Sequence, residues 1–78
     1  MRTAEENLDR YYLEMRWRCL SLAADLDRVE RSDGGRELLR TDGRLLKLRE
    51  AIGLLLEEGP DRAERVQNVF SDKTAPVR

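Results

Sequence analysis

The chain has 78 residues, of which 40% are charged, and the opposite signs nearly cancel to a formal net charge of −1. A domain this short normally needs a disulfide, a metal or oligomerisation to be stable, and one Cys with no His excludes an internal disulfide and a Cys/His zinc site. Of the three sources of stability, self-association therefore remains. The near-neutral charge also argues against a protein that binds nucleic acid through a basic excess.

The first predicted element is a long helix from about Thr3 to Ser32. Thr3 and Glu6 have the spacing of a capping box, in which each side chain accepts the other residue's free backbone N–H. No Gly or Pro interrupts the residues that follow, and the helix has three acid-first pairs at the favourable spacing of four: Glu6–Arg10, Glu14–Arg18 and Asp27–Arg31. The SDGG sequence then ends the helix, because Gly34 or Gly35 can adopt the left-handed conformation of a helix C-terminus.

The second predicted element is a helix over about Arg36–Glu58. The TDG sequence at 41–43 is a weak point within it, because Asp42 could cap a new helix start. Two arrangements therefore stay open, either one helix or a short turn of helix followed by a main helix from Gly43. The GP sequence at 59–60 is a stronger stop, since Gly59 suits the position just after a helix.

A short third helix is predicted from about Pro60 to Phe70, with Pro60 in its first turn. Residues 71–78 have no apolar pattern, and we expect them to form a disordered C-terminal tail. The predicted organisation is a single helical domain over residues 1–70 followed by this tail.

The long helix carries apolar residues on two opposite sides. The first stripe alternates steps of four and three residues, as in helices packed at shallow angles: Leu8, Tyr12, Met15, Cys19, Leu22, Leu26 and Val29. The second stripe lies about 180° away at 3.6 residues per turn and contains Leu13, Trp17, Leu20 and Ala24. Because an ordinary surface helix has one apolar face, we expect this helix to lie between two neighbours.

The second helix can supply one of these neighbours. It presents an apolar arc made of Leu45, Leu48, Ile52, Leu55 and Leu56. We expect it to fold back across the SDGG turn as an antiparallel hairpin that covers one stripe. The third helix, roughly 16 Å long, is too short to cover the other stripe of a helix roughly 45 Å long, although Trp17 packing beneath it is the alternative within one chain.

The predicted fold is therefore all-α, an antiparallel helical hairpin with a short C-terminal helix, and two copies are expected to form a four-helix bundle. Trp17 is the expected anchor of the interface, since tryptophan buries a large area with few rotatable bonds. Leu39, Leu46 and Leu54 lie outside the arc of the second helix, so that helix also has surplus apolar surface. The predicted interface residues are Leu13, Trp17, Leu20, Ala24, Leu46 and Leu54. Another helical protein is an alternative occupant of these faces.

The sequence gives weaker support to two other classes of function. A basic row on the second helix could contact nucleic acid, and it contains Arg36, Arg40, Arg44 and Lys47. Interspersed acidic residues favour a solvated charged face there instead. Enzymatic chemistry ranks third, because Cys19 has no His to activate it and is expected to be a small buried apolar residue. We predict no catalytic residue, metal or cofactor.

The sequence contains no apolar run near the roughly 20 residues that span a bilayer. The N-terminal residues also lack the apolar core of a signal peptide. With a single cysteine, these features favour a cytoplasmic protein that does not associate with membranes.

Overall fold

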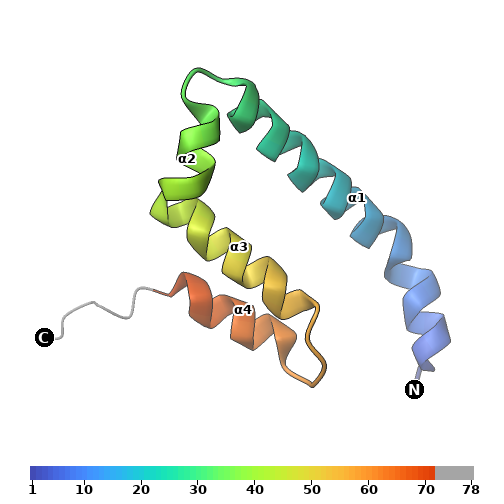
Figure 1. The fold of residues 1–78 in the computed structure, drawn as a ribbon. Coiled ribbons are helices and arrows are strands. Elements are labelled where there is room, and N and C mark those ends of the chain that lie inside the picture. The colour runs from blue at the N-terminus through green and yellow to red at the C-terminus, as the bar shows by residue number, and fades with distance from the viewer. Residues whose placement is uncertain (72–78) are drawn as a thin grey trace, which may run out of the picture. The chain divides into compact units, whose positions relative to one another are not determined.

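Caps and glycines set the ends of the helices in the part of this chain that the structure describes. A computed structural model describes residues 1–71, in which the helices are α1 (Ala4–Arg31), α2 (Gly35–Thr41), α3 (Gly43–Leu55) and α4 (Arg62–Phe70) (Figure 1). These described residues contain no strand, so the predicted all-α class is confirmed. The chain divides into two units, one of residues 1–36 and one beginning at Glu37, and each has its own internal contacts.

The N-terminus of α1 has the predicted capping box. The backbone N–H of Thr3 donates to Glu6 Oε1 at 2.8 Å, and the N–H of Glu6 donates to Thr3 Oγ1 at 3.1 Å. These two bonds satisfy donors that the first turn of a helix leaves free. Thr3 is therefore the N-cap, and the predicted long helix is confirmed to within one residue at this end.

The C-terminus of α1 is closed by Ser32 and two glycines. The Ser32 hydroxyl donates to the carbonyl of Arg28 at 2.7 Å, and Gly34 has a φ of 78°, the left-handed conformation expected for one of the two glycines. Gly35 has a different role. It is buried, and a Cβ placed there would overlap the backbone carbonyls of Val29 and Glu30. The turn thus requires both glycines.

The predicted second helix is two helices. Asp42 adopts an extended conformation between α2 and α3, and its carboxylate accepts the backbone N–H of Arg44 at 2.8 Å. This cap resolves the question that the TDG sequence left open. The predicted end at Glu58 is wrong, because α3 stops at Leu55 and Gly59, with a φ of 109°, lies in the loop beyond it.

The predicted start of the last helix at Pro60 is also wrong. Asp61 has a left-handed φ of 65°, so helical geometry begins only at Arg62. The Arg62 guanidinium donates to the carbonyl of Glu57 through Nε at 3.1 Å and Nη2 at 2.7 Å. Arg65 adds an ion pair with the Glu57 carboxylate at 3.3 Å. These contacts close the loop between α3 and α4.

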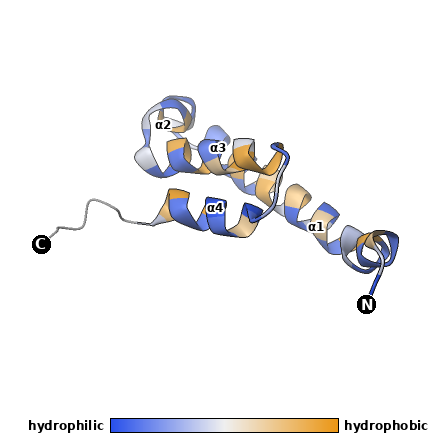
Figure 2. Ribbon diagram, turned by 90° about the horizontal axis from the view of Figure 1, so that it is seen from below, coloured by the Kyte–Doolittle hydropathy of each residue, from blue (hydrophilic) through white to orange (hydrophobic). Residues whose placement is uncertain are grey.

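Helices α3 and α4 pack side by side as an antiparallel pair (Figures 1 and 2). Ala51 of α3, 4% exposed, is the buried apolar residue of the described chain. Val66 and Val69 of α4 are half-buried. The structure therefore gives the last helix a defined neighbour, α3. The predicted tail beyond Ser71 lies outside the described residues.

Candidate protein interface

The second stripe of α1 combines large apolar side chains with high exposure. Leu13, Trp17 and Leu20 are 65%, 70% and 54% exposed, and Ala24 is half-buried. A shallow hollow on this side of the helix is lined by Leu13, Arg16, Trp17 and Leu20. Three of the four predicted α1 residues thus line one hollow, and Ala24 does not. Large exposed apolar patches on small domains usually mark sites of contact.

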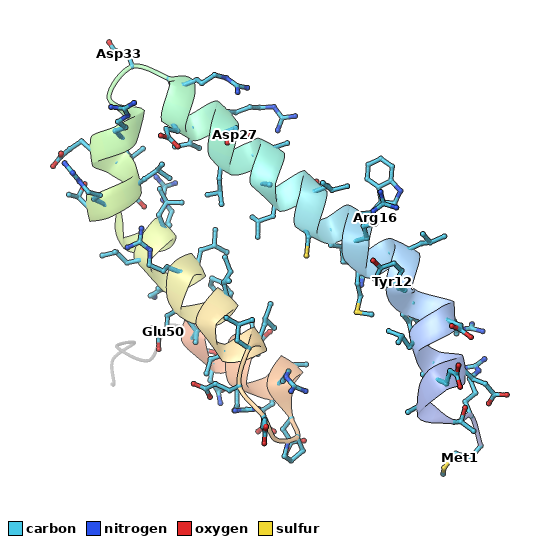
Figure 3. All side chains as sticks on the ribbon, turned by 45° about the vertical axis from the view of Figure 1, so that its right-hand side comes forward. Met1, Tyr12, Arg16, Asp27, Asp33 and Glu50 are labelled. Atoms are coloured by element: carbon cyan, nitrogen blue, oxygen red, sulfur yellow. The ribbon has the colours of Figure 1, made fainter. Side chains whose placement is uncertain are left out.

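The first stripe of α1 is also open along its N-terminal half. Its exposed large residues are Leu8, Tyr12 and Met15, and its C-terminal residues Leu22, Leu26 and Val29 are half-buried. Cys19 is exposed, so its expected burial is wrong for the structure described. Figure 3 shows side chains projecting from α1 along its length, among them Tyr12, Arg16 and Asp27. No residue of α1 is buried, although this helix carries two apolar stripes.

The two predicted interface residues of α3 differ in their surroundings. Leu46 is 46% exposed, whereas Leu54 is half-buried one turn beyond Ala51. Ala51 itself was not expected in a core, although a small residue at this position lets α4 approach the backbone of α3. A search of the sequence for small residues between leucines one turn apart could have found it. Leu46 and Leu54 belong to a different unit from the α1 stripe.

Ion pairs form at one of the three predicted positions along α1. Arg18 and Glu14 pair at 3.3 Å, but within residues 1–71 neither Glu6 with Arg10 nor Asp27 with Arg31 does so. The Arg10 guanidinium instead lies 5.7 Å from the centre of the Tyr11 ring. The Glu6 carboxylate likewise has a different partner, the backbone N–H of Thr3.

A two-pronged ion pair lies at the break between α2 and α3. Arg44 Nε and Nη2 each donate to the Asp42 carboxylate at 3.0 Å. These side-chain bonds, aided by the backbone N–H of Arg44, lower the pKa of Asp42 below its ordinary value and raise the pKa of Arg44. The contact lies at the start of α3, where the Asp42 carboxylate caps the first turn.

The basic row proposed for nucleic acid is split by this break. Arg36 and Arg40 lie on α2, whereas Arg44 and Lys47 lie on α3. Each of the three arginines forms an ion pair with a carboxylate. Glu37 lies 2.6 Å from Arg40, Glu30 lies 3.7 Å from Arg36, and Asp42 pairs with Arg44 as described above. No observation on the described chain favours nucleic acid over a solvated charged face.

Residues 1–71 offer little support for a metal-ion site or a membrane-spanning helix. No three Cys, Asp or Glu side chains of this part of the chain gather closely enough to hold a metal ion. Among its helices, none combines the length and apolarity needed to cross a bilayer.

Comparison with models of known protein families, with curated proteins and with solved structures found no match for this chain.

Proposed function

We propose that this chain is a small, cytoplasmic, non-enzymatic protein that associates with a second copy of itself through the second stripe of α1. In the proposed assembly, the rest of the chain folds back along the first stripe as a hairpin, and two hairpins form a four-helix bundle. Leu46 and Leu54 of α3 extend the interface.

The observation that carries the proposal is the exposure of Trp17, which is 70%, between two exposed leucines on the same side of one helix. Fully burying one leucine-sized side chain contributes about 1.5–3 kcal/mol, and tryptophan is enriched among the residues that dominate interfaces. Association would therefore remove three large, exposed apolar side chains from water.

Trp17 also provides the test, because it is the only tryptophan in the chain. We predict that its fluorescence emission shifts to shorter wavelength, and that acrylamide quenches it less, as the protein concentration rises through the association range. A chain carrying Leu13→Asp and Leu20→Asp serves as the control and keeps the emission of an exposed indole throughout. An exposed, readily quenched Trp17 at every concentration of the unaltered protein would refute the proposal.

A further inference from the structure

The first stripe of α1 has a matching row of residues on α2 and α3. From Leu38 onward the steps along this row alternate three and four residues, the spacing of helices packed at shallow angles. We call this row the α2–α3 seam, and it contains Leu38, Thr41, Leu45, Leu48, Ile52 and Leu55. The first stripe has the same alternation, so each row has the spacing that the other requires of a partner.

Helix α4 leaves the α2–α3 seam open. It packs on α3 at the side of the buried Ala51, which at about 100° per residue lies about 80° from the centre of the seam. Leu55 at the far end of the seam is 55% exposed, and Leu8 and Tyr12 of the first stripe are 52% and 53% exposed. A shallow hollow along the first stripe is lined by Leu8, Tyr12, Met15, Arg16, Cys19 and Leu20. Both rows therefore present apolar surface for a further contact.

We propose that the α2–α3 seam of the same chain covers the first stripe, in the antiparallel register that places Cys19 opposite Leu48. The inference rests on the hairpin of the proposed assembly and adds its register, and it does not depend on self-association through Trp17. The facing pairs are Val29 with Leu38, Leu26 with Thr41, Leu22 with Leu45, Cys19 with Leu48, Met15 with Ile52, and Tyr12 with Leu55.

Every facing pair in this register joins two apolar side chains, apart from Leu26 with Thr41. The Thr41 hydroxyl already donates to the carbonyl of Glu37 at 3.0 Å. Its polar atom therefore has a partner, and Thr41 can face Leu26 without burying an unsatisfied hydroxyl. Because each step of three must face a step of three, other registers that align the two rows differ from this one by whole heptads.

The turn after α1 selects among these registers. Helices joined by a short loop run antiparallel, and the residues at the midpoint of the register must form the reversal. The midpoint of the proposed register lies between Asp33 and Gly34, in the turn that separates α1 from α2, where Gly34 is left-handed. A shift of one heptad would move the midpoint to Glu30 or to Glu37, and both lie within helices. The observed helix bounds therefore favour the proposed register.

Charged side chains on the flanks do not alter this choice. In an antiparallel pair, the same flank of each helix meets. On one flank Asp25 would lie near Arg44, an opposite-charge pair, and on the other Arg16 would lie near Arg49, a like-charge pair. Exposed ion pairs contribute little, whereas burial of large apolar side chains is the main source of stability. The apolar pairs therefore determine the register.

Cys19 makes the register testable with one substitution, because it is the only cysteine in the chain. Leu48→Cys should place a second thiol opposite Cys19, within the distance that a disulfide spans. Thr41→Cys and Leu55→Cys are the matched controls, since each places the thiol one heptad away from that position. We expect Leu48→Cys to form an intramolecular disulfide at least about tenfold faster than either control under mild oxidation.

Thiol titration measures the rate, a non-reducing gel gives the mass of the product, and circular dichroism compares the helicity of the variants. In concentrated urea the three variants should oxidise at similar rates, because the cost of closing a loop grows slowly with its length. A second pair of positions guards against misfolding of Leu48→Cys. In a Cys19→Ser background, Met15→Cys combined with Ile52→Cys should close as readily as Leu48→Cys does with Cys19.

Two results would overturn the inference and leave a hairpin or an exchanged hairpin in place. Faster closure in Thr41→Cys or Leu55→Cys would show a different register, and covalent dimers of Leu48→Cys at low protein concentration would show that a second copy supplies the seam. Equal rates for all three variants without urea would show that no hairpin forms, and that part of the proposed function would fail too. Trp17 fluorescence tests self-association separately, so the two failures are distinguishable.

Discussion

At the scale of single residues, the turn after α1 depends on two glycines for different reasons. Gly34 is needed for its conformation, since a φ of 78° is unfavourable for residues with a side chain. Gly35 is needed for space, because a Cβ there would overlap the carbonyl groups of Val29 and Glu30. A sequence identifies glycines as turn formers, but it does not separate these two causes.

We therefore predict that Gly35→Ala destabilises the fold more than Gly34→Ala. Strain from a left-handed alanine costs about 1–2 kcal/mol, whereas overlap with backbone atoms forces the turn to move and costs about 2–3 kcal/mol. Urea unfolding at one protein concentration measures both variants, and the m-value checks that the transition stays comparable. Equal losses, or a larger loss for Gly34→Ala, would contradict the role assigned to Gly35.

At the scale of elements, caps that act within one turn were predictable and contacts over longer spacing were not. Thr3 with Glu6 and Asp42 with Arg44 are bonded within three residues, so the sequence pattern predicts both helix starts. The start of α4 depends instead on Arg62, which reaches back five residues to the carbonyl of Glu57. No local rule contains that contact, and the usual preference of Pro60 for a first helical turn led to the wrong start.

For the candidate interface, too, the sequence predicts some features and not others. Periodicity alone places Leu13, Trp17 and Leu20 on one side of a helix, and the structure adds that each is more than half exposed. The core position of Ala51 was missed because it depends on which face of α3 meets α4. A sequence pattern identifies an apolar face without identifying what covers it.

The cap at the start of α3 should depend on pH. The folded pKa of Asp42 is lowered, so the unfolded chain takes up the proton more readily than the folded one. The stabilisation by this carboxylate is complete above the ordinary Asp pKa of about 3.9 and is lost as pH falls towards the folded pKa. Stability should therefore decline below about pH 4 through this group.

Asp42→Asn isolates this effect, because Asn caps helices as well as Asp but carries no charge for Arg44. We predict that the unaltered protein is the more stable at pH 7 and that the difference shrinks steadily between pH 4 and pH 2. Urea unfolding across this range measures it. A difference that stays constant with pH would show that the Asp42 charge does not stabilise the start of α3.

At the scale of the whole molecule, the central feature is a helix of 28 residues with two apolar stripes and no buried residue. Chains of this size bury a limited fraction of their surface, and residues 1–71, with Ala51 as their buried apolar residue, have little core of their own. A second copy that covers the Trp17 stripe would supply the missing burial. Association and folding stability should then rise together with concentration.

Sedimentation equilibrium of the full chain over a wide concentration range tests this account most directly. We predict a mass that approaches twice the chain mass of 9.1 kDa at high concentration. Trp17→Ala should raise the dissociation constant by about 30-fold, the equivalent of about 2 kcal/mol for an interface anchor. A folded, helical protein that keeps the mass of one chain at every concentration would contradict the account.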